Sequence, residues 1–390
     1  MTHRRLIGLI GLLVVLDLVL WSAITPMISY WKHTIGLTKP EAGVASGIYS
    51  GAIVLLSIPA GRLADRVGAK PVTLAATLLF AITAPLTGFA DAVWQVIILR
   101  FVQGSFSAVA WSAGLAWLAS AVGPSERARA IGLINALVPV GMVGGPALGG
   151  PAVDQFGPKA TFIGFGVIVL VLLAMLAMQP DAEATHDEHL SLKATAKLAV
   201  RDSWLFAANA SIFVLAFGQT LLQTLAPLHL DAAGIGQDRI GYLFMATASM
   251  SLLATVVTAR LQHRVASLRP RFVLWGITIA GATAALFTLP LAVPLYCAVA
   301  IAYSAPQSVA FTSSYALAGD GAARSGVGQG VAMATLSTFW GIGAAISPTL
   351  LAPLAQATSD GVVFGLLSIA MLISAVWLFR AVRTPVRPTM

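Results

Sequence analysis

Two ionisable side chains of opposite charge, Asp17 and Arg100, each lie well inside a long apolar run of the sequence. If such a run crosses a membrane, a charged aspartate at its centre costs roughly 2.5–3.5 kcal/mol on insertion scales, which favours a functional role. We expect Asp17 to be a cavity acid that takes up a proton or a cationic substrate. Trp21 lies one helical turn further on, and its ring suits an organic cation. The alternative is a structural aspartate that is hydrogen-bonded to a neighbouring helix.

A polar stripe accompanies Arg100. Gln103, Ser107 and Trp111 follow it at intervals of three, seven and eleven residues, which places the four side chains on one face of a helix. A guanidinium in this position either holds helices together through an internal carboxylate or carbonyl group, or binds an anionic substrate with its planar fork. We count the whole stripe among the candidate substrate-binding residues.

The second half of the chain offers uncharged hydrogen-bonding groups in place of charges. Three pairs at helical spacing lie in separate apolar runs: Gln219 and Gln223, Tyr303 and Gln307, and Thr335 and Thr338. Such groups serve either as contacts between helices or as contacts to a substrate. All six are candidate substrate-binding residues.

Glycines at every fourth position, Gly141, Gly145 and Gly149, leave a groove without side chains along one predicted helix. This spacing allows another helix to approach closely. The sequence contains no nucleophile–base set, no cluster of metal ligands and no phosphate-binding loop, and the single Cys297 excludes a disulfide framework. We therefore expect no enzyme, no ATP-driven transport, no cofactor and no metal.

Charge is concentrated in the decapeptide GRLADRVGAK at residues 61–70, although only 10% of the chain is charged. Lys and Arg are favoured in short loops on the cytoplasmic side of a membrane. This bias explains why Arg62, Arg66 and Lys70 lie in such a loop. It does not explain the acidic Asp65 among them, because the bias concerns only Lys and Arg.

Membrane-spanning helices must position all of these residues. The chain has 390 residues, of which 58% are hydrophobic, and a mean hydropathy of +0.87. Apolar runs of about 20 residues, the length that a helix needs to cross a bilayer, recur along it, and only a helix satisfies its backbone within one such segment. We predict an all-α membrane protein with spans at residues 6–30, 41–61, 71–90, 93–121, 128–150, 160–179, 204–230, 239–259, 271–290, 292–317, 326–352 and 361–381.

The basic residues predict the orientation of these spans. With both termini on one side, that side holds 18 of the 23 Lys and Arg residues, while the opposite side holds Lys32, Lys39, Lys159 and Arg239. Positive residues favour the cytoplasmic side, so we expect both termini to be cytoplasmic. Because the basic residues are scattered over short loops, the net charge of +8 does not indicate nucleic-acid binding.

The two halves of the chain resemble each other. GRLADRVGAKP at residues 61–71 matches ARLQHRVASLRP at residues 259–270 with a shift of 198 positions. Six plus six spans repeated in the same direction imply two bundles with a substrate cavity between them. We predict an N-terminal six-helix bundle at residues 1–179, a cytoplasmic linker at 180–203 and a C-terminal six-helix bundle at 204–390.

These residues resemble the major facilitator superfamily, and the resemblance covers nearly the whole chain. Its loop signature G-x-L-a-D-r-x-G-r-k is met by Gly61, Leu63, Ala64, Asp65, Arg66, Gly68 and Lys70, with Ala69 departing from it. Its fourth-helix signature R-x-x-q-G is met by Arg100, Gln103 and Gly104. Its fifth-helix antiporter signature g-x-x-x-G-P-x-x-G-G is met by Gly141, Gly145, Pro146, Gly149 and Gly150.

This resemblance implies a secondary transporter with two six-helix bundles. In the family, the loop signature forms a cytoplasmic gate, in which Asp65 is expected to latch against the start of helix eleven, near Arg324. The resemblance also implies that Arg100 couples proton and substrate. The fifth-helix signature is similar to that of proton-coupled drug antiporters, where it implies a seal against leak.

The first half of the chain resembles the vesicular amine transporters through Asp17, Pro26 and the run QFGPKATF at residues 155–162. The second half departs from that group. Where the group has acidic residues in helices seven, ten and eleven, this chain has Gln223, Ala310 and Ser337.

We expect proton-coupled antiport of small, lipophilic, cationic compounds out of a cell by a monomer in a plasma or inner membrane, with substrate, proton and lipid bilayer as partners. The alternative is a proton-coupled permease for a neutral or anionic metabolite such as a sugar, a nucleoside or an organic acid, which Arg100 and the polar second half favour. A third possibility is a transporter-like sensor or scaffold without turnover, which a flux measurement in proteoliposomes would separate from the other two.

Overall fold

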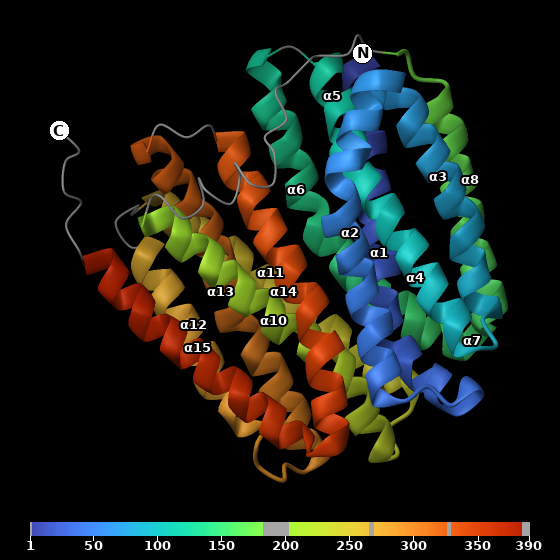
Figure 1. The fold of residues 1–390 in the computed structure, drawn as a ribbon. Coiled ribbons are helices and arrows are strands. Elements are labelled where there is room, and N and C mark those ends of the chain that lie inside the picture. The colour runs from blue at the N-terminus through green and yellow to red at the C-terminus, as the bar shows by residue number, and fades with distance from the viewer. Residues whose placement is uncertain (1, 123, 182–202, 265–268, 326–328, 384–390) are drawn as a thin grey trace. The chain divides into compact units, whose positions relative to one another are not determined.

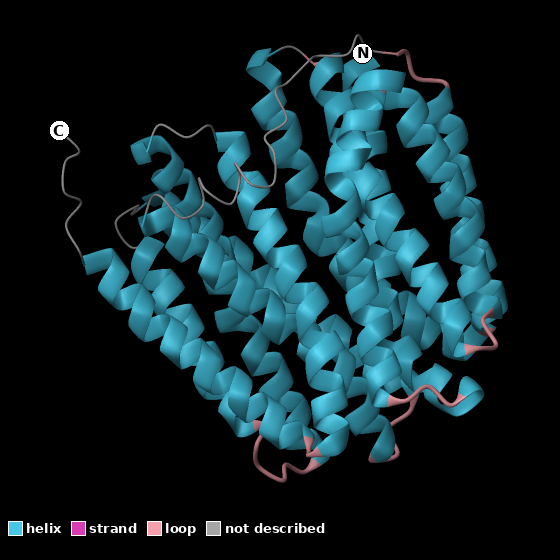
Figure 2. Cartoon of the chain, viewed as in Figure 1, coloured by secondary structure: helices cyan, strands magenta, loops and turns pink. Residues whose placement is uncertain are grey.

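The computed structural model describes residues 2–122, 124–181, 203–264, 269–325 and 329–383. This part of the chain consists of helices joined by short turns and contains no strand (Figure 2). Each of the twelve predicted spans coincides with a long helical segment, which confirms the all-α fold class.

The first six long segments contain three short irregular turns. They are α1 (Thr2–Ile35); α2 (Lys39–Val67); α3 (Ala69–Leu86), continued by the 3₁₀ turn η1 (Thr87–Phe89); α4 (Val93–Val109), continued by the π-helical turn η2 (Ala110–Gly114) and α5 (Leu115–Ala121); α6 (Pro124–Ala147), continued by the π-helical turn η3 (Leu148–Ala152) and α7 (Val153–Phe156); and α8 (Pro158–Ala177). The second six are α10 (Ser203–Ala232), α11 (Gln237–Arg264), α12 (Arg269–Leu286), α13 (Val293–Ser325), α14 (Gln329–Ala357) and α15 (Asp360–Arg383).

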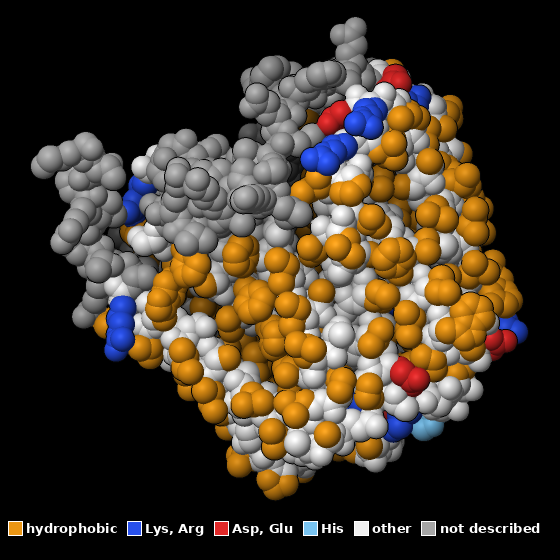
Figure 3. Space-filling view, viewed as in Figure 1, with side chains coloured by type: hydrophobic (Ala, Val, Ile, Leu, Met, Phe, Trp, Pro, Cys, Tyr) orange, Lys and Arg blue, Asp and Glu red, His pale blue; other side chains and the backbone are white. Residues whose placement is uncertain are grey.

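The outer faces of these helices suit a lipid environment. Among the described residues, nine helical segments are long and apolar enough to cross a membrane; the other three long helices are α6, α12 and α13. On α8, Val167, Ile168 and Val171 are 52%, 51% and 55% exposed. Figure 3 shows hydrophobic side chains covering the sides of the helices on the visible face, with charged side chains gathered toward the helix ends. The chain is therefore a multi-pass membrane protein.

The charged decapeptide at residues 61–70 is mostly helical. Helix α2 continues to Val67 and α3 begins at Ala69, so the connection between them is reduced to Gly68. Gly68 has a φ of +104°, a conformation that residues with a side chain rarely adopt. The turn lies where the sequence predicts it, but it is shorter than predicted. Its charged residues lie on the last turns of α2 and the first turn of α3.

The chain divides into two compact units by its contacts: Met1–His189 with Ala226–Ala246, and Leu190–Leu225 with Thr247–Met390. Helices α10 and α11 therefore each run from one unit into the other. The predicted bundle boundaries at 1–179 and 204–390 stay predictions, since most of the predicted linker lies outside the described residues.

In the first unit, α1 packs along α6, α2 along α4, and α3 along α8 (Figure 1). Phe80 of α3 stacks on Phe106 of α4 with ring centroids 4.0 Å apart, and the edge of Phe165 from α8 meets Phe80 at 5.9 Å. Leu13 and Leu20 of α1 are at most 1% exposed in the same core. The middle of α1 is thus enclosed by apolar side chains.

In the second unit, α12 packs along α13 and α15. Phe287, just after α12, is the centre of an aromatic cluster, with ring centroids 5.0 Å from Tyr296, 6.4 Å from Tyr303 and 4.8 Å from Phe364. This cluster ties α13 and α15 to the end of α12.

Candidate functional site

The carboxylate of Asp17 is buried in the first unit and bound on both oxygens. Its side chain is 1% exposed. Tyr49 of α2 donates its hydroxyl hydrogen bond to Oδ1 at 2.8 Å. Ser107 of α4 donates to Oδ2 at 2.7 Å, and the indole N–H of Trp111 in η2 donates to the same oxygen at 3.3 Å. Three helices thus converge on one acid, and all of its direct hydrogen-bond partners are uncharged.

Arg100 approaches this acid through Tyr49. The guanidinium carbon lies 4.3 Å from the centroid of the Tyr49 ring, a cation–π contact. The guanidinium also donates to the carbonyl of Ala45 and to Oε1 of Gln103, each at 3.4 Å. Arg100 is 2% exposed, and in the described residues it forms no ion pair with Asp17. The aromatic ring therefore links the two charges without direct contact between them.

Gln103 extends the network away from the acid. Its side-chain amide donates to the hydroxyl of Thr87 in η1 at 2.8 Å, and it is 1% exposed. The predicted stripe of Arg100, Gln103, Ser107 and Trp111 thus lies on one continuous chain of polar contacts that ends at Asp17. Trp21 is buried one turn further along α1, with 7% exposure.

Gly104 explains why α2 and α4 bring these groups together. A Cβ atom added at Gly104 would lie 2.9 Å from Cα of Tyr49 and still closer to its carbonyl oxygen. Helix α4 therefore rests directly on the backbone of α2 at Tyr49, with Arg100 and Ser107 on either side of this contact. After Ser107, the π-helical turn η2 carries Trp111, and such turns are frequent at functional sites.

Sequence reasoning missed Tyr49 and Thr87. Both are nine-tenths or more buried, and both supply hydroxyl groups to the network. A signal for Tyr49 was present, since it is a large polar aromatic residue within the otherwise small run AGVASGIYSGA at residues 42–52. Small residues around one large side chain indicate close helix packing at that point.

The candidate residues of the second unit do not form one hydrogen-bonded network. Gln307 donates to the carbonyl of Leu215 at 2.9 Å, which joins α13 to α10. The hydroxyls of Thr335 and Thr338 bond back to carbonyl groups of their own helix. The buried hydroxyl of Tyr303 has no partner in the described structure. Gln219 and Gln223, one turn apart on α10, are half-buried.

The glycine groove of the fifth-helix signature is filled by α1. A Cβ at Gly141 would lie 2.6 Å from Cβ of Leu18, and Cβ atoms at Gly145 and Gly149 would meet the backbone of α1. At the following Gly150, a Cβ would lie 2.7 Å from Cα of Gly241 on α11. The groove therefore produces close packing, as its spacing predicts. Pro146 lies at the same contact, because its carbonyl would be 2.8 Å from a Cβ at Gly241.

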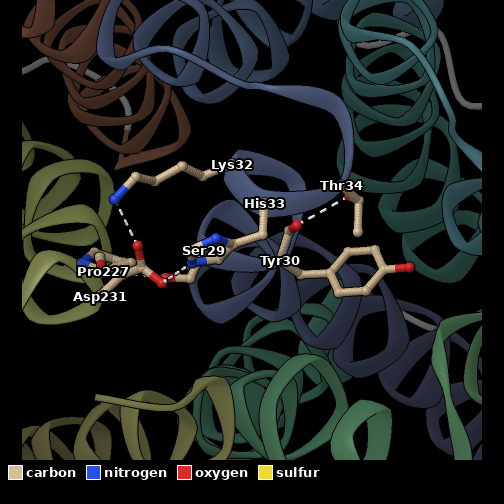
Figure 4. Close-up of polar contacts among 7 residues, drawn as sticks. All are labelled: Ser29, Tyr30, Lys32, His33, Thr34, Pro227 and Asp231. Atoms are coloured by element: carbon tan, nitrogen blue, oxygen red, sulfur yellow. Dashed lines mark hydrogen bonds and ion pairs between the residues drawn. The ribbon is translucent and has the colours of Figure 1, made fainter. Parts of the chain in front are cut away.

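A second polar cluster joins the end of α1 to the end of α10 within the first unit (Figure 4). Lys32 Nζ lies 2.6 Å from Oδ2 of Asp231, and His33 Nε2 lies 2.6 Å from Oδ1 of the same residue. Ser29 donates to the carbonyl of Pro227 at 3.1 Å. We call these five residues the Asp231 clamp. The clamp was not predicted from the sequence, where Lys32 was counted only among the few basic residues on the side opposite the termini.

The residues of the predicted cytoplasmic gate are partly described. Gly61 is buried, Asp65 is half-buried, Arg66 is exposed and Lys70 donates to the carbonyl of Gln179 after α8. Arg324 at the end of α13 lies over the ring of Trp204, 4.1 Å from its centroid. The expected partner of Asp65 lies at the start of the eleventh predicted span, 326–352, which falls partly on residues 326–328, outside the described residues. The latch stays a prediction.

Comparison with known proteins gives relatives among transporters. An MFS-type transporter, ppzB of Metarhizium rileyi, is 28% identical over 170 residues, which are 42% of this chain and 35% of the relative. The tetracenomycin C resistance and export protein of Streptomyces glaucescens is 31% identical over 134 residues, 34% of this chain and 25% of the relative. The chain thus spans less than half the length of the curated relatives it matches.

The fold also matches a solved structure over nearly the whole chain. The crystal structure of the nucleoside transporter NupG superposes with a TM-score of 0.76 at 12% identity, covering 97% of this chain and all of that one. The family model of the Major Facilitator Superfamily matches residues 10–335, which include the acid, the polar stripe and the glycine groove. This chain therefore belongs to the Major Facilitator Superfamily, and this family and the relatives that the chain resembles are transporters rather than enzymes.

Proposed function

We propose that this transporter exports small, lipophilic, cationic compounds in exchange for protons, across a plasma or inner membrane with both termini cytoplasmic. One observation carries the proposal. The buried carboxylate of Asp17 is held by a phenol, a hydroxyl and an indole, and no Lys or Arg is paired with it in the described residues. Its charge is therefore open to neutralisation by a proton or by a substrate cation.

Exchange follows from competition at this acid. A protonated carboxyl no longer attracts a cation, so a proton and a cationic substrate exclude each other at Asp17. When the site faces the side with more protons, the proton displaces the cation; on the other side the reverse occurs. Alternating exposure of one site to the two sides converts this competition into antiport. One shared carboxylate suggests an exchange of one proton for one cation.

Two further features support efflux of lipophilic cations. The rings of Trp21 and Trp111 lie on α1 and η2 near the acid, and aromatic faces attract organic cations. The close packing of the glycine groove against α1 leaves no room for side-chain motion along that contact, which suits a seal against proton leak. The relative from Streptomyces glaucescens carries export in its name, which supports the outward direction.

The second candidate is a proton-coupled permease for a neutral or anionic metabolite. The unpartnered hydroxyl of Tyr303 and the half-buried amides of Gln219 and Gln223 favour it, because they offer hydrogen bonds without charge. Arg100 would serve an anionic substrate. The nucleoside transporter NupG shares the fold at low identity.

Flux through proteoliposomes with an imposed pH gradient tests the two candidates. Tetraphenylphosphonium, a lipophilic cation, and uridine, a neutral nucleoside, serve as probes. We expect gradient-driven counterflow of tetraphenylphosphonium that Asp17→Asn abolishes and that the matched control Asp154→Asn, at an exposed position on α7, retains. Uridine flux without any cation flux would overturn the proposal in favour of the permease. Normal cation flux in Asp17→Asn would show that another group carries the proton.

A further inference from the structure

The two oxygens of Asp17 are not equivalent. Oδ2 accepts from Ser107 and from the indole of Trp111, whereas Oδ1 accepts only from Tyr49. An indole N–H is a donor only, while a serine or tyrosine hydroxyl can donate or accept. A proton on Oδ2 could be accepted by the Ser107 hydroxyl, but the indole would still donate to that oxygen and favour its negative charge. A proton on Oδ1 meets only the Tyr49 hydroxyl, which can accept it, so Oδ1 is the favoured position.

The Tyr49 hydroxyl can thus accept a hydrogen bond from protonated Asp17 by rotating its own hydrogen away. The rest of the tyrosine cannot move easily. It is 2% exposed, its backbone is pressed against Gly104, and its ring carries the guanidinium of Arg100 at 4.3 Å. The Tyr49 side chain therefore contacts Asp17 with a hydroxyl that can either donate or accept, and it contacts Arg100 with the face of its ring.

The ring also gives Arg100 a partner other than the acid. The charged or titratable groups that act on Asp17 are Arg100 from α4 and Tyr49 from α2. Helix α6 packs along α1, and the glycines of its groove contact uncharged residues of α1 such as Leu18, Val19 and Ser22. Without the Tyr49 ring, Arg100 would lose its cation–π partner, and a guanidinium pairs well with a carboxylate.

We propose that Tyr49 is the positioning residue of the proton site: its hydroxyl directs the proton to Oδ1 of Asp17, and its ring prevents Arg100 from forming a permanent ion pair with that acid. This inference rests on the proposed use of Asp17 as the proton site. It predicts opposite effects for two substitutions. Tyr49→Phe keeps the ring but removes the donor to the charged carboxylate, which disfavours the charged form. Tyr49→Leu removes the ring, so Arg100 can stabilise the charged form.

Infrared titration of the purified protein tests the inference without any substrate. The carbonyl band of the protonated Asp17 carboxyl is assigned by its absence in Asp17→Asn. Its intensity is then measured against pH, and the titration midpoint is the pH at which half of the carboxyl is protonated. We expect Tyr49→Phe to move the midpoint upward by about one pH unit and Tyr49→Leu to move it downward by at least as much. Tyr242→Phe is the matched control, because Tyr242 is 57% exposed and lies outside the network, and its midpoint should not move.

The outcomes separate this inference from the proposed function. An unchanged midpoint in Tyr49→Phe would overturn the role of the hydroxyl, and an upward shift in both variants would overturn the role of the ring. If Tyr49→Leu does not fold, Tyr49→Phe, which loses a single oxygen atom, still decides the role of the hydroxyl. Absence of cation flux in the wild-type protein would overturn cation export and leave the infrared result standing.

Discussion

Removing the carboxylate of Asp231 should release the end of α1 from the end of α10. In the clamp this carboxylate contacts both Lys32 and His33 at 2.6 Å. Asp231→Asn preserves the shape of the side chain and removes its charge. Because α10 runs from the second unit into the first, and alternating access must open each end of a transporter in turn, we expect the variant to populate the state that is open at this end.

The size of the effect follows from exposure. The Asp231 side chain is 8% exposed, that of Lys32 is 35% and that of His33 is 66%. Exposed ion pairs contribute about 0.2–1 kcal/mol, whereas breaking a fully buried pair costs about 3–5 kcal/mol. With one partner buried and the others partly solvated, we expect about 1–2 kcal/mol. This corresponds to roughly a five- to thirtyfold change in the ratio of open to closed forms.

The labelling rate of a cysteine introduced next to the clamp, at position 27, reports the ratio of open to closed forms. Met27 is 0% exposed and lies 3.4 Å from the amide of Gln237, so a cysteine at position 27 reacts with a membrane-impermeant maleimide only when this end opens. In a Cys297→Ser background, Asp231→Asn should raise the labelling rate roughly tenfold, and the Asp154→Asn control should not. The double exchange Lys32→Asp with Asp231→Lys should restore slow labelling. A rate unchanged by Asp231→Asn at low salt would refute the reasoning.

Three further predictions concern the other motifs. Arg100→Lys should fail to restore full transport flux, because a point charge replaces a planar group that stacks on Tyr49 and donates to two acceptors; full flux would reduce its role to charge alone. Gly104→Ala should lower the melting temperature by the equivalent of about 1–3 kcal/mol, whereas Gly164→Ala, where a Cβ meets nothing within 4 Å, should not. Asp65→Asn should raise cysteine labelling at the ends of α5 and α13, which are the predicted cytoplasmic ends of the fourth and tenth spans, while leaving the melting temperature intact. Unchanged labelling would leave the charged decapeptide as an orientation signal.

The spans and the stripe on α4 could be predicted because both are local properties of the chain. Apolar length identifies a membrane helix without reference to its neighbours, and helical spacing alone places Arg100, Gln103, Ser107 and Trp111 on one face. The partners across helices are not local. The position of Tyr49 opposite this stripe depends on how closely α2 and α4 pack. Gly104 permits the close approach, but the sequence alone does not say which helix lies against it.

The extent of the α2–α3 turn was not predictable from hydropathy. The apolar run ends at three charged residues, Arg62, Asp65 and Arg66. The helix nevertheless continues through them, because arginine favours a helical backbone and aspartate is tolerated in one. The chain leaves the helix only at Gly68, where φ becomes positive. Hydropathy marks where a helix leaves the bilayer, and backbone conformation marks where it stops.

The spacing of the Asp231 clamp has a consequence for which helix ends can form it. Ser29 meets Pro227, and His33 meets Asp231, across a separation of 198 residues in both cases, which is also the shift between the two similar loops. Counted with the shift of the two similar loops, each contact joins a position in the first half of the sequence to its counterpart in the second half. The two ends are not interchangeable, because the end of α1 brings Lys32 to this contact and the end of α10 brings Asp231. A contact of either end with a copy of itself would bring like charges together, so the clamp forms only between two different partners.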